Sequence, residues 1–100
     1  MFVIIWEFLV RRDRAEEFEA VYGPQGEWAQ LFMRSDDYHG TDLHRDLTRP
    51  TRYISVDRWS DAAAFDRFRQ QNSSDYAALD RSCQTLTERE TQLGNFESLE

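Results

Sequence analysis

The chain has 100 residues and a formal charge of −7, and all twelve of its cationic residues are arginine. This acidic balance argues against binding to nucleic acid or to an anionic membrane, because both need positive charge along one face. The absence of lysine excludes Schiff-base chemistry and a catalytic lysine. The length fits a single domain over residues 1–100.

The apolar start of the chain, Met1–Val10, is not expected to act as a signal peptide or a membrane span. It holds ten residues, carries Glu7 and lacks a basic leader, whereas a spanning helix needs about 20 apolar residues. The single Cys83 rules out a disulfide within the chain and fits a reducing compartment. We therefore expect a cytoplasmic protein.

The first half of the chain predicts a strand followed by a broken helix. Phe2–Val10 is apolar on both alternating faces, which indicates a strand that is covered on both sides and lies centrally in a sheet. Apolar residues at helical spacing follow from Arg14 to Phe32. Gly23–Gly26 contains Pro24 and two glycines, so we expect it to break this helix.

Two alternating segments, Tyr38–Leu47 and Arg52–Trp59, predict a hairpin with Thr48–Thr51 as its loop. The second half continues with helices and a last strand. Ser60 or Asp61 is expected to cap a helix, and Ser73 or Ser74 a further one.

The final segment, Thr87–Leu93, alternates with charged residues, which favours an edge strand. The order strand, helix, strand, strand, helix, strand predicts an α+β fold of the ferredoxin-like, split βαβ type. Its four-stranded antiparallel sheet would carry helices on one face only. A second copy of the chain is the economical cover for the other face.

Five segments, spread over nearly the whole chain, resemble the antibiotic biosynthesis monooxygenase family of the dimeric α/β-barrel superfamily. They are YGPQGEWAQLF (Tyr22–Phe32), GTDLHRD (Gly40–Asp46), YISVDRW (Tyr53–Trp59), DYAALDRSC (Asp75–Cys83) and LTERETQLGNF (Leu86–Phe96). The resemblance implies a homodimer in which two ferredoxin-like sheets face each other as a barrel. Some family members are cofactor-independent oxygenases of aromatic polyketides, some degrade haem, and many have no assigned activity.

Within this family a tryptophan near the end of the third strand often borders the pocket, and Trp59 resembles it. The haem-degrading branch pairs that tryptophan with an asparagine on the first strand and a histidine on the following helix. This chain has Trp6-Glu7 in the first strand and Arg69 about ten residues past Trp59. The haem-degrading pattern therefore fails at two of its three residues.

The register of the hairpin decides which side chains share a face. A hairpin closed symmetrically around Arg49-Pro50 would place His44 opposite Ser55, while a slip of one residue would turn His44 away. In the symmetric register the apolar residues Leu43, Ile54 and Val56 would meet the helices. The mixed face, turned toward a partner sheet or a cavity at its edge, would then carry His44, Tyr53, Ser55, Asp57 and Trp59.

His44 is the candidate general base, because unperturbed histidine titrates near neutral pH. Asp57 is the candidate that orients its imidazole, and Trp59 the candidate pocket wall. The alternative is an Asp57–Arg58 surface charge pair beside a packing tryptophan. Aromatic residues at helical spacing indicate core packing or the lining of a small apolar pocket: Trp28, Phe32, Phe65 and Tyr76.

No metal-ligand cluster and no phosphate, flavin or nicotinamide fingerprint is expected, so we predict no cofactor and no metal. The resemblance favours a cofactor-independent monooxygenase that acts on a small aromatic substrate of polyketide or phenol type. A small-molecule-binding dimer without turnover, or a structural barrel filled with side chains, stays open as the alternative.

Overall fold

A computed structural model describes residues 1–99 of the chain and has the α+β, ferredoxin-like arrangement that the sequence predicts. Each helical part of that pattern is divided into two helices. The elements in chain order are β1 (Phe2–Val10), a 3₁₀ turn η1 (Arg12–Arg14), α1 (Ala15–Tyr22), α2 (Glu27–Phe32), β2 (Tyr38–Arg45), β3 (Arg52–Trp59), α3 (Ala62–Gln71), α4 (Ser73–Cys83) and β4 (Thr87–Glu97).

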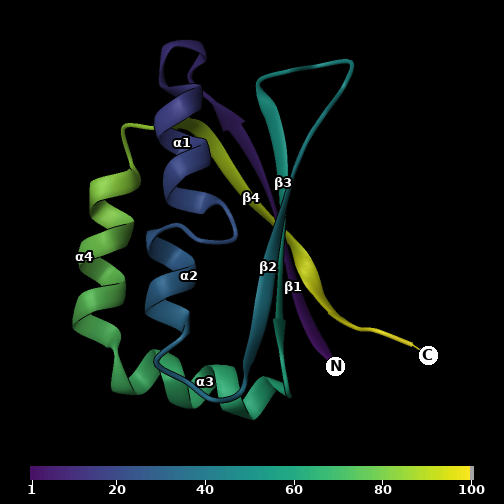
Figure 1. Ribbon diagram of the computed structural model, residues 1–100, viewed down its shortest axis with the longest axis vertical. Helices are drawn as coiled ribbons and strands as arrows, with labels where there is room; N and C mark the ends of the chain where they lie inside the picture. The colour runs from purple at the N-terminus through teal and green to yellow at the C-terminus, as the bar shows by residue number, and fades with distance from the viewer. Residues whose placement is uncertain (100) are drawn as a thin grey trace.

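The four strands form one antiparallel sheet in the order β2-β3-β1-β4. The central place of β1 is confirmed, and so is the place of β4 at an edge. Figure 1 shows α1, α2 and α4 along one side of this sheet, with α3 across its lower end. None of the helices in residues 1–99 has the length and apolar character that crossing a membrane requires.

The core lies between the sheet and the helices and is built largely of aromatic rings. Trp59 and Phe18 are completely buried. The ring of Trp59 meets those of Phe32 and Phe68 at centroid distances of 5.5 Å and 5.2 Å. Edge-to-face contacts of this kind add to the burial of apolar area, so these rings hold the helices onto the sheet.

The predicted break between α1 and α2 is confirmed, and Gly26 explains its tightness. A Cβ atom at Gly26 would lie 2.3 Å from the carbonyl oxygen of Val21, so no larger residue fits here without movement. Asp61 caps α3, since its carboxylate accepts a hydrogen bond from the Ala64 amide at 2.8 Å. The expected cap at Ser73 or Ser74 is wrong: Asn72 precedes α4, and no side chain caps it.

The symmetric hairpin register is also wrong. His44 pairs with Ile54, Leu43 with Ser55 and Thr41 with Asp57, one residue away from the expected pairing. His44 therefore lies on the face opposite to Asp57. The helices cover the face that carries Tyr53, Ser55, Asp57 and Trp59, and all four of these side chains are buried.

The loop explains the shift in register. Asp46 stands opposite Arg52, whose carbonyl accepts a hydrogen bond from the Asp46 amide at 2.9 Å. The loop between them, Leu47–Thr51, has an odd number of residues and so centres on Arg49. The Asp46 carboxylate also accepts hydrogen bonds from the amides of Thr48 and Arg49, at 2.9 and 3.2 Å. Such side-chain bonds fold the chain back locally and compete with further strand pairing.

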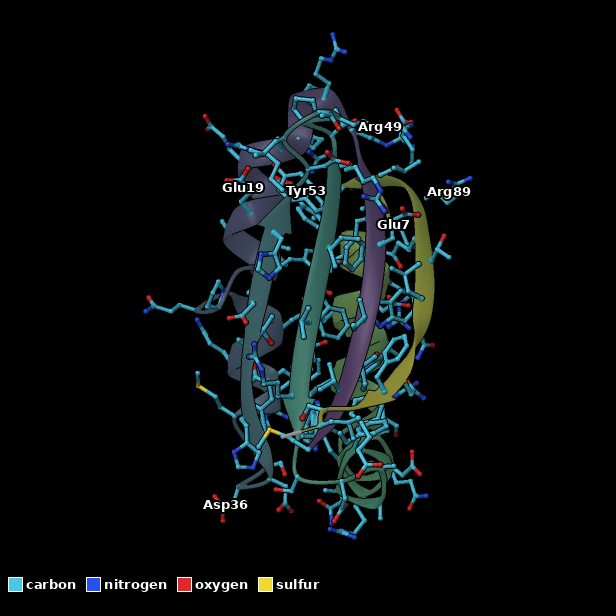
Figure 2. All side chains as sticks on the ribbon, turned by 90° about the vertical axis from the view of Figure 1, so that its right-hand side faces the viewer. Glu7, Glu19, Asp36, Arg49, Tyr53 and Arg89 are labelled. Atoms are coloured by element: carbon cyan, nitrogen blue, oxygen red, sulfur yellow. The ribbon has the colours of Figure 1, made fainter. Side chains whose placement is uncertain are left out.

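The other sheet face, which we call the open face, has no helix over it in the part of the chain that the structure describes. Figure 2 looks onto this face, with the strands in front of the helices. Two ion pairs lie on it: Arg52 Nε binds Glu7 Oε2 at 2.6 Å, and Arg58 binds Asp42. Between them the face is aliphatic, with Val3, Ile5, Leu9, Ile54 and Val56.

Candidate functional site

A cavity of about 320 Å³ lies between the sheet and the helices. This volume is at the lower end of the range of ligand pockets, about 300–1,000 Å³. Every strand and α-helix contributes to its lining: Trp6, Phe8, Tyr22, Trp28, Phe32, Thr41, Ser55, Asp57, Arg69, Tyr76, Asp80, Glu90 and Gln92.

The inner part of the cavity is aromatic. Trp6 and Phe8 rise from β1, where strand alternation puts them on the helix-covered face. Trp28 and Phe32 stand four residues apart on α2, and Tyr76 of α4 meets Trp28 edge to face at a centroid distance of 5.0 Å. A planar aromatic ligand would find flat apolar surfaces on both sides of the cavity.

Asp57 is the buried carboxyl group of this cavity. Only 9% of the residue is exposed, and the Thr41 hydroxyl donates a hydrogen bond to its Oδ1 at 2.6 Å. Burial raises the pKa of Asp57 to about 6, while the Thr41 hydrogen bond and the charge of Arg58 oppose the rise. A carboxyl group with a pKa near 6 is suited to accept a proton at neutral pH.

A second hydroxyl extends this contact. Tyr38 and Thr41 share a short hydrogen bond, and the single Thr41 hydroxyl proton is used on Asp57. Tyr38 is therefore the donor to Thr41. The chain Tyr38–Thr41–Asp57 fixes the carboxylate on β3 and leaves its other oxygen outside this chain of bonds.

Charged and polar residues gather where the lining is exposed: Arg69, Asp80, Glu90 and Gln92. The guanidinium carbon of Arg69 lies 4.0 Å from the centre of the Tyr76 ring, which is a close cation–π contact. The Tyr22 hydroxyl donates to Glu90 Oε1 at 3.4 Å, and burial raises the pKa of both groups. We call the side chains Arg69, Asp80, Glu90 and Gln92 the rim.

The structure brings half of the predicted site residues to the cavity: Asp57, Trp28, Phe32 and Tyr76. The other half lies elsewhere: His44, Tyr53, Trp59 and Phe65.

His44 is exposed on the open face, across the sheet from Asp57. Trp59 is enclosed by other rings, Phe65 among them, so it belongs to the core and does not border the cavity. Tyr53 is buried as well, and its hydroxyl donates a hydrogen bond to Glu19. The sheet thus separates His44 from the residues with which it was expected to act.

Sequence reasoning missed Trp6, Thr41 and the whole rim. Trp6 carried a usable signal, because it alternates with Phe8 on one face of β1. Thr41 depends on the hairpin register, and the rim depends on how helices pack, so neither followed from periodicity. Within residues 1–99 no group of three histidine, cysteine or acidic side chains is placed to hold a metal ion.

Comparison with known proteins identifies the family. The model of the antibiotic biosynthesis monooxygenase family matches residues 1–78. SnoaB from Streptomyces nogalater, described as a cofactor-independent oxygenase, superimposes with a TM-score of 0.80 in its N63A variant. It is 22% identical, over 99% of this chain and 93% of SnoaB.

A candidate antibiotic biosynthesis monooxygenase from Bordetella bronchiseptica is 26% identical, with a TM-score of 0.75, over 98% of this chain and 96% of its own. A further candidate from Deinococcus radiodurans is 14% identical with the same TM-score, over 100% and 94% of the two chains. No curated protein matches. Since the family model covers 78 of the 100 residues, this chain belongs to the antibiotic biosynthesis monooxygenase family.

Proposed function

We propose that the protein is a cofactor-independent monooxygenase that oxidises a small, electron-rich aromatic compound of phenol or polyketide type in this cavity. The observation that carries the proposal is an aromatic-walled cavity that holds one buried carboxyl group, Asp57, with a pKa near 6. Membership of the family and the fold shared with SnoaB support the reaction class. The flat apolar walls of the cavity support the proposed substrate class.

In this proposal the substrate supplies the electrons. A phenol gives its proton to Asp57, and the phenolate passes one electron to dioxygen. The two radicals couple to form a carbon–oxygen bond at a ring carbon, and the Asp57 proton returns to the peroxide. The ring carbon then loses its hydrogen as a proton while hydroxide leaves from the peroxide. Phenol and dioxygen thus become quinone and water.

The protein contributes position, exclusion of water and a proton acceptor. Asp57 takes the place that the sequence suggested for His44, because it lines the cavity and His44 does not. Thr41 orients the carboxylate through its hydrogen bond. Haem degradation is disfavoured, since Arg69 stands where relatives of that type carry a histidine, and no histidine lines the cavity within residues 1–99.

Oxygen uptake in the presence of hydroxylated naphthalenes, such as 1-naphthol, tests this proposal. With ¹⁸O₂, one labelled atom is expected in the quinone, at a rate above that without protein. Asp57→Asn should lower kcat by about 10²–10⁴-fold, the usual contribution of a general base. His44→Ala should leave kcat unchanged. Ligand binding without oxygen uptake would instead assign a binding role without turnover.

We also propose that the chain forms a homodimer through the open face. Within residues 1–99, four aliphatic side chains of this face are only partly buried and have no helix over them: Ile5, Leu9, Ile54 and Val56. Apolar surface that water can reach favours association with a partner. A second copy would cover the aliphatic strip of β1 and β3 with the same strip of its partner, as the symmetry of a homodimer requires. The ion pairs at Glu7 and Asp42 would then lie at the border of that interface.

A further inference from the structure

The hydroxyl of Tyr76 differs from those of the other three tyrosines. Tyr22 donates to Glu90, Tyr38 bonds to Thr41, and Tyr53 donates to Glu19. Within residues 1–99 the Tyr76 hydroxyl has no hydrogen-bond partner, although the residue lines the cavity and is half-buried. Since this hydroxyl has no partner among these residues and is not enclosed by them, it is available to a ligand in the cavity.

The ring of Tyr76 is held on two sides. Trp28 packs against it edge to face, and the Arg69 guanidinium lies over it at 4.0 Å. Burial and the nearby charges of Asp80 and Asp57 raise the pKa of Tyr76, and Arg69 opposes this rise. The hydroxyl therefore stays protonated at neutral pH and can donate a hydrogen bond.

Arg69 adds further donors beside this hydroxyl. Within the described residues no carboxylate lies within ion-pair distance of its guanidinium, in contrast to Arg67 on the same helix, which pairs with Asp37 at 3.7 Å. Donors from α3 and α4 thus face the cavity from the helix side. The acceptor Asp57 faces it from the sheet side.

We propose that the cavity recognises a neutral two-ring aromatic ligand with a hydroxyl group on one edge and a carbonyl oxygen on another. The hydroxyl donates to Asp57, and the carbonyl accepts from Tyr76 and Arg69. This inference rests on the proposed function and names the substrate class of the same site. It makes Tyr76 and Arg69 binding residues that select the substrate.

The charge of the rim favours a carbonyl group over a carboxylate in the ligand. Asp80 and Glu90 flank the donors, so two carboxylates stand against the single cation of Arg69. A ligand carboxylate would be repelled by both, whereas a carbonyl oxygen takes the same hydrogen bonds without a net charge.

Four bicyclic ligands test this assignment in binding experiments without oxygen. They are 6-hydroxy-1-tetralone, which carries both groups, 1-tetralone, 5,6,7,8-tetrahydro-2-naphthol and the carboxylate 6-hydroxy-2-naphthoate. Dissociation constants come from tryptophan fluorescence and calorimetry. The hydroxytetralone is expected to bind about fivefold or more tightly than either compound with a single group, since each hydrogen bond contributes about 1 kcal/mol. The naphthoate should bind weakest.

The variants should separate the two ends of the ligand. Tyr76→Phe keeps the ring and should weaken binding of the two ketones roughly fivefold, with no change in the dissociation constant of the tetrahydronaphthol. Arg69→Gln should act in the same direction. Asp57→Asn should weaken binding of 6-hydroxy-1-tetralone and of the tetrahydronaphthol by about tenfold and leave binding of 1-tetralone unchanged. Tyr53→Phe and Arg67→Gln are the matched controls, and neither should change any of the constants.

Equal losses for all ligands in Tyr76→Phe, or a preference for the naphthoate, would overturn the inference while leaving an oxygenase possible. No binding of any ligand would overturn it together with the site. Selective binding without oxygen uptake would support it and refute only the monooxygenase reaction.

Discussion

The buried carboxylate of Asp57 lowers the stability of the folded protein. A buried carboxylate loses its hydration, and one hydrogen bond from Thr41 replaces it only in part. The resulting rise in the pKa of Asp57 from 3.8 to about 6 corresponds to a loss on the order of 3 kcal/mol at pH 7. Destabilising groups of this kind are typical of functional sites.

The pH dependence of unfolding tests this loss at Asp57. Between about pH 4 and pH 6 the folded protein keeps a proton that the unfolded chain has released, so its stability falls as the pH rises. Asp57→Asn removes the charge and keeps an acceptor for Thr41. Below pH 4 the variant and the wild type should have the same free energy of unfolding in urea. At pH 7 that of the variant should be higher by on the order of 3 kcal/mol. If the variant is less stable than the wild type at pH 7, other interactions of the Asp57 carboxylate offset the cost of burying it, and the predicted loss is wrong.

At the scale of single elements, the hairpin shows what sequence patterns can and cannot predict. The alternation in Arg52–Trp59 predicted the bounds of β3 correctly. It did not show which face is buried, because Ile54 and Val56 look more apolar than Ser55 and Asp57. The large rings at Tyr53 and Trp59 decide this, since they bury more area than two aliphatic side chains.

The strands, the break between α1 and α2 and the central place of β1 followed from periodicity and from the glycine–proline signals, because local geometry imposes both. The cavity did not. It depends on the odd loop Leu47–Thr51, on the side-chain bonds of Asp46 and on the angle at which the helices meet the sheet. The symmetric register would have put His44 on the same face as Asp57. The observed register, shifted by one residue, puts Thr41 opposite Asp57 instead.

The caps of α3 and α4 offer a test at this scale. Asp61 accepts a hydrogen bond from the Ala64 amide, whereas no side chain caps α4. Asp61→Ala should therefore lower the free energy of unfolding by about 1 kcal/mol. Ser74→Ala is the matched control inside the first turn of α4, and a change of less than half that size is expected in urea unfolding. Equal losses in both variants would contradict the assigned caps.

At the scale of the whole molecule, the sheet separates two roles. Its helix-covered face contributes Trp6, Thr41 and Asp57 to the cavity. Its open face, which carries the aliphatic strip of β1 and β3, lies across the sheet from that lining (Figure 2). If a second copy covers the open face, assembly and ligand binding depend on different residues.

This separation predicts the behaviour of a variant in the centre of the open face. Val56→Arg puts a large charged side chain where two copies would meet, and removing that charge from water in an interface is unfavourable. Light scattering should give twice the chain mass of 11.9 kDa for the wild type and the mass of one chain for the variant. Leu47→Arg, in the exposed loop, should stay dimeric. The monomeric variant should still bind 6-hydroxy-1-tetralone within about twofold of the wild type, because the strand residues that line the cavity lie on the opposite face of the sheet from Val56. A wild-type monomer at micromolar concentration would refute the dimer, and loss of binding in Val56→Arg would show that the partner shapes the site.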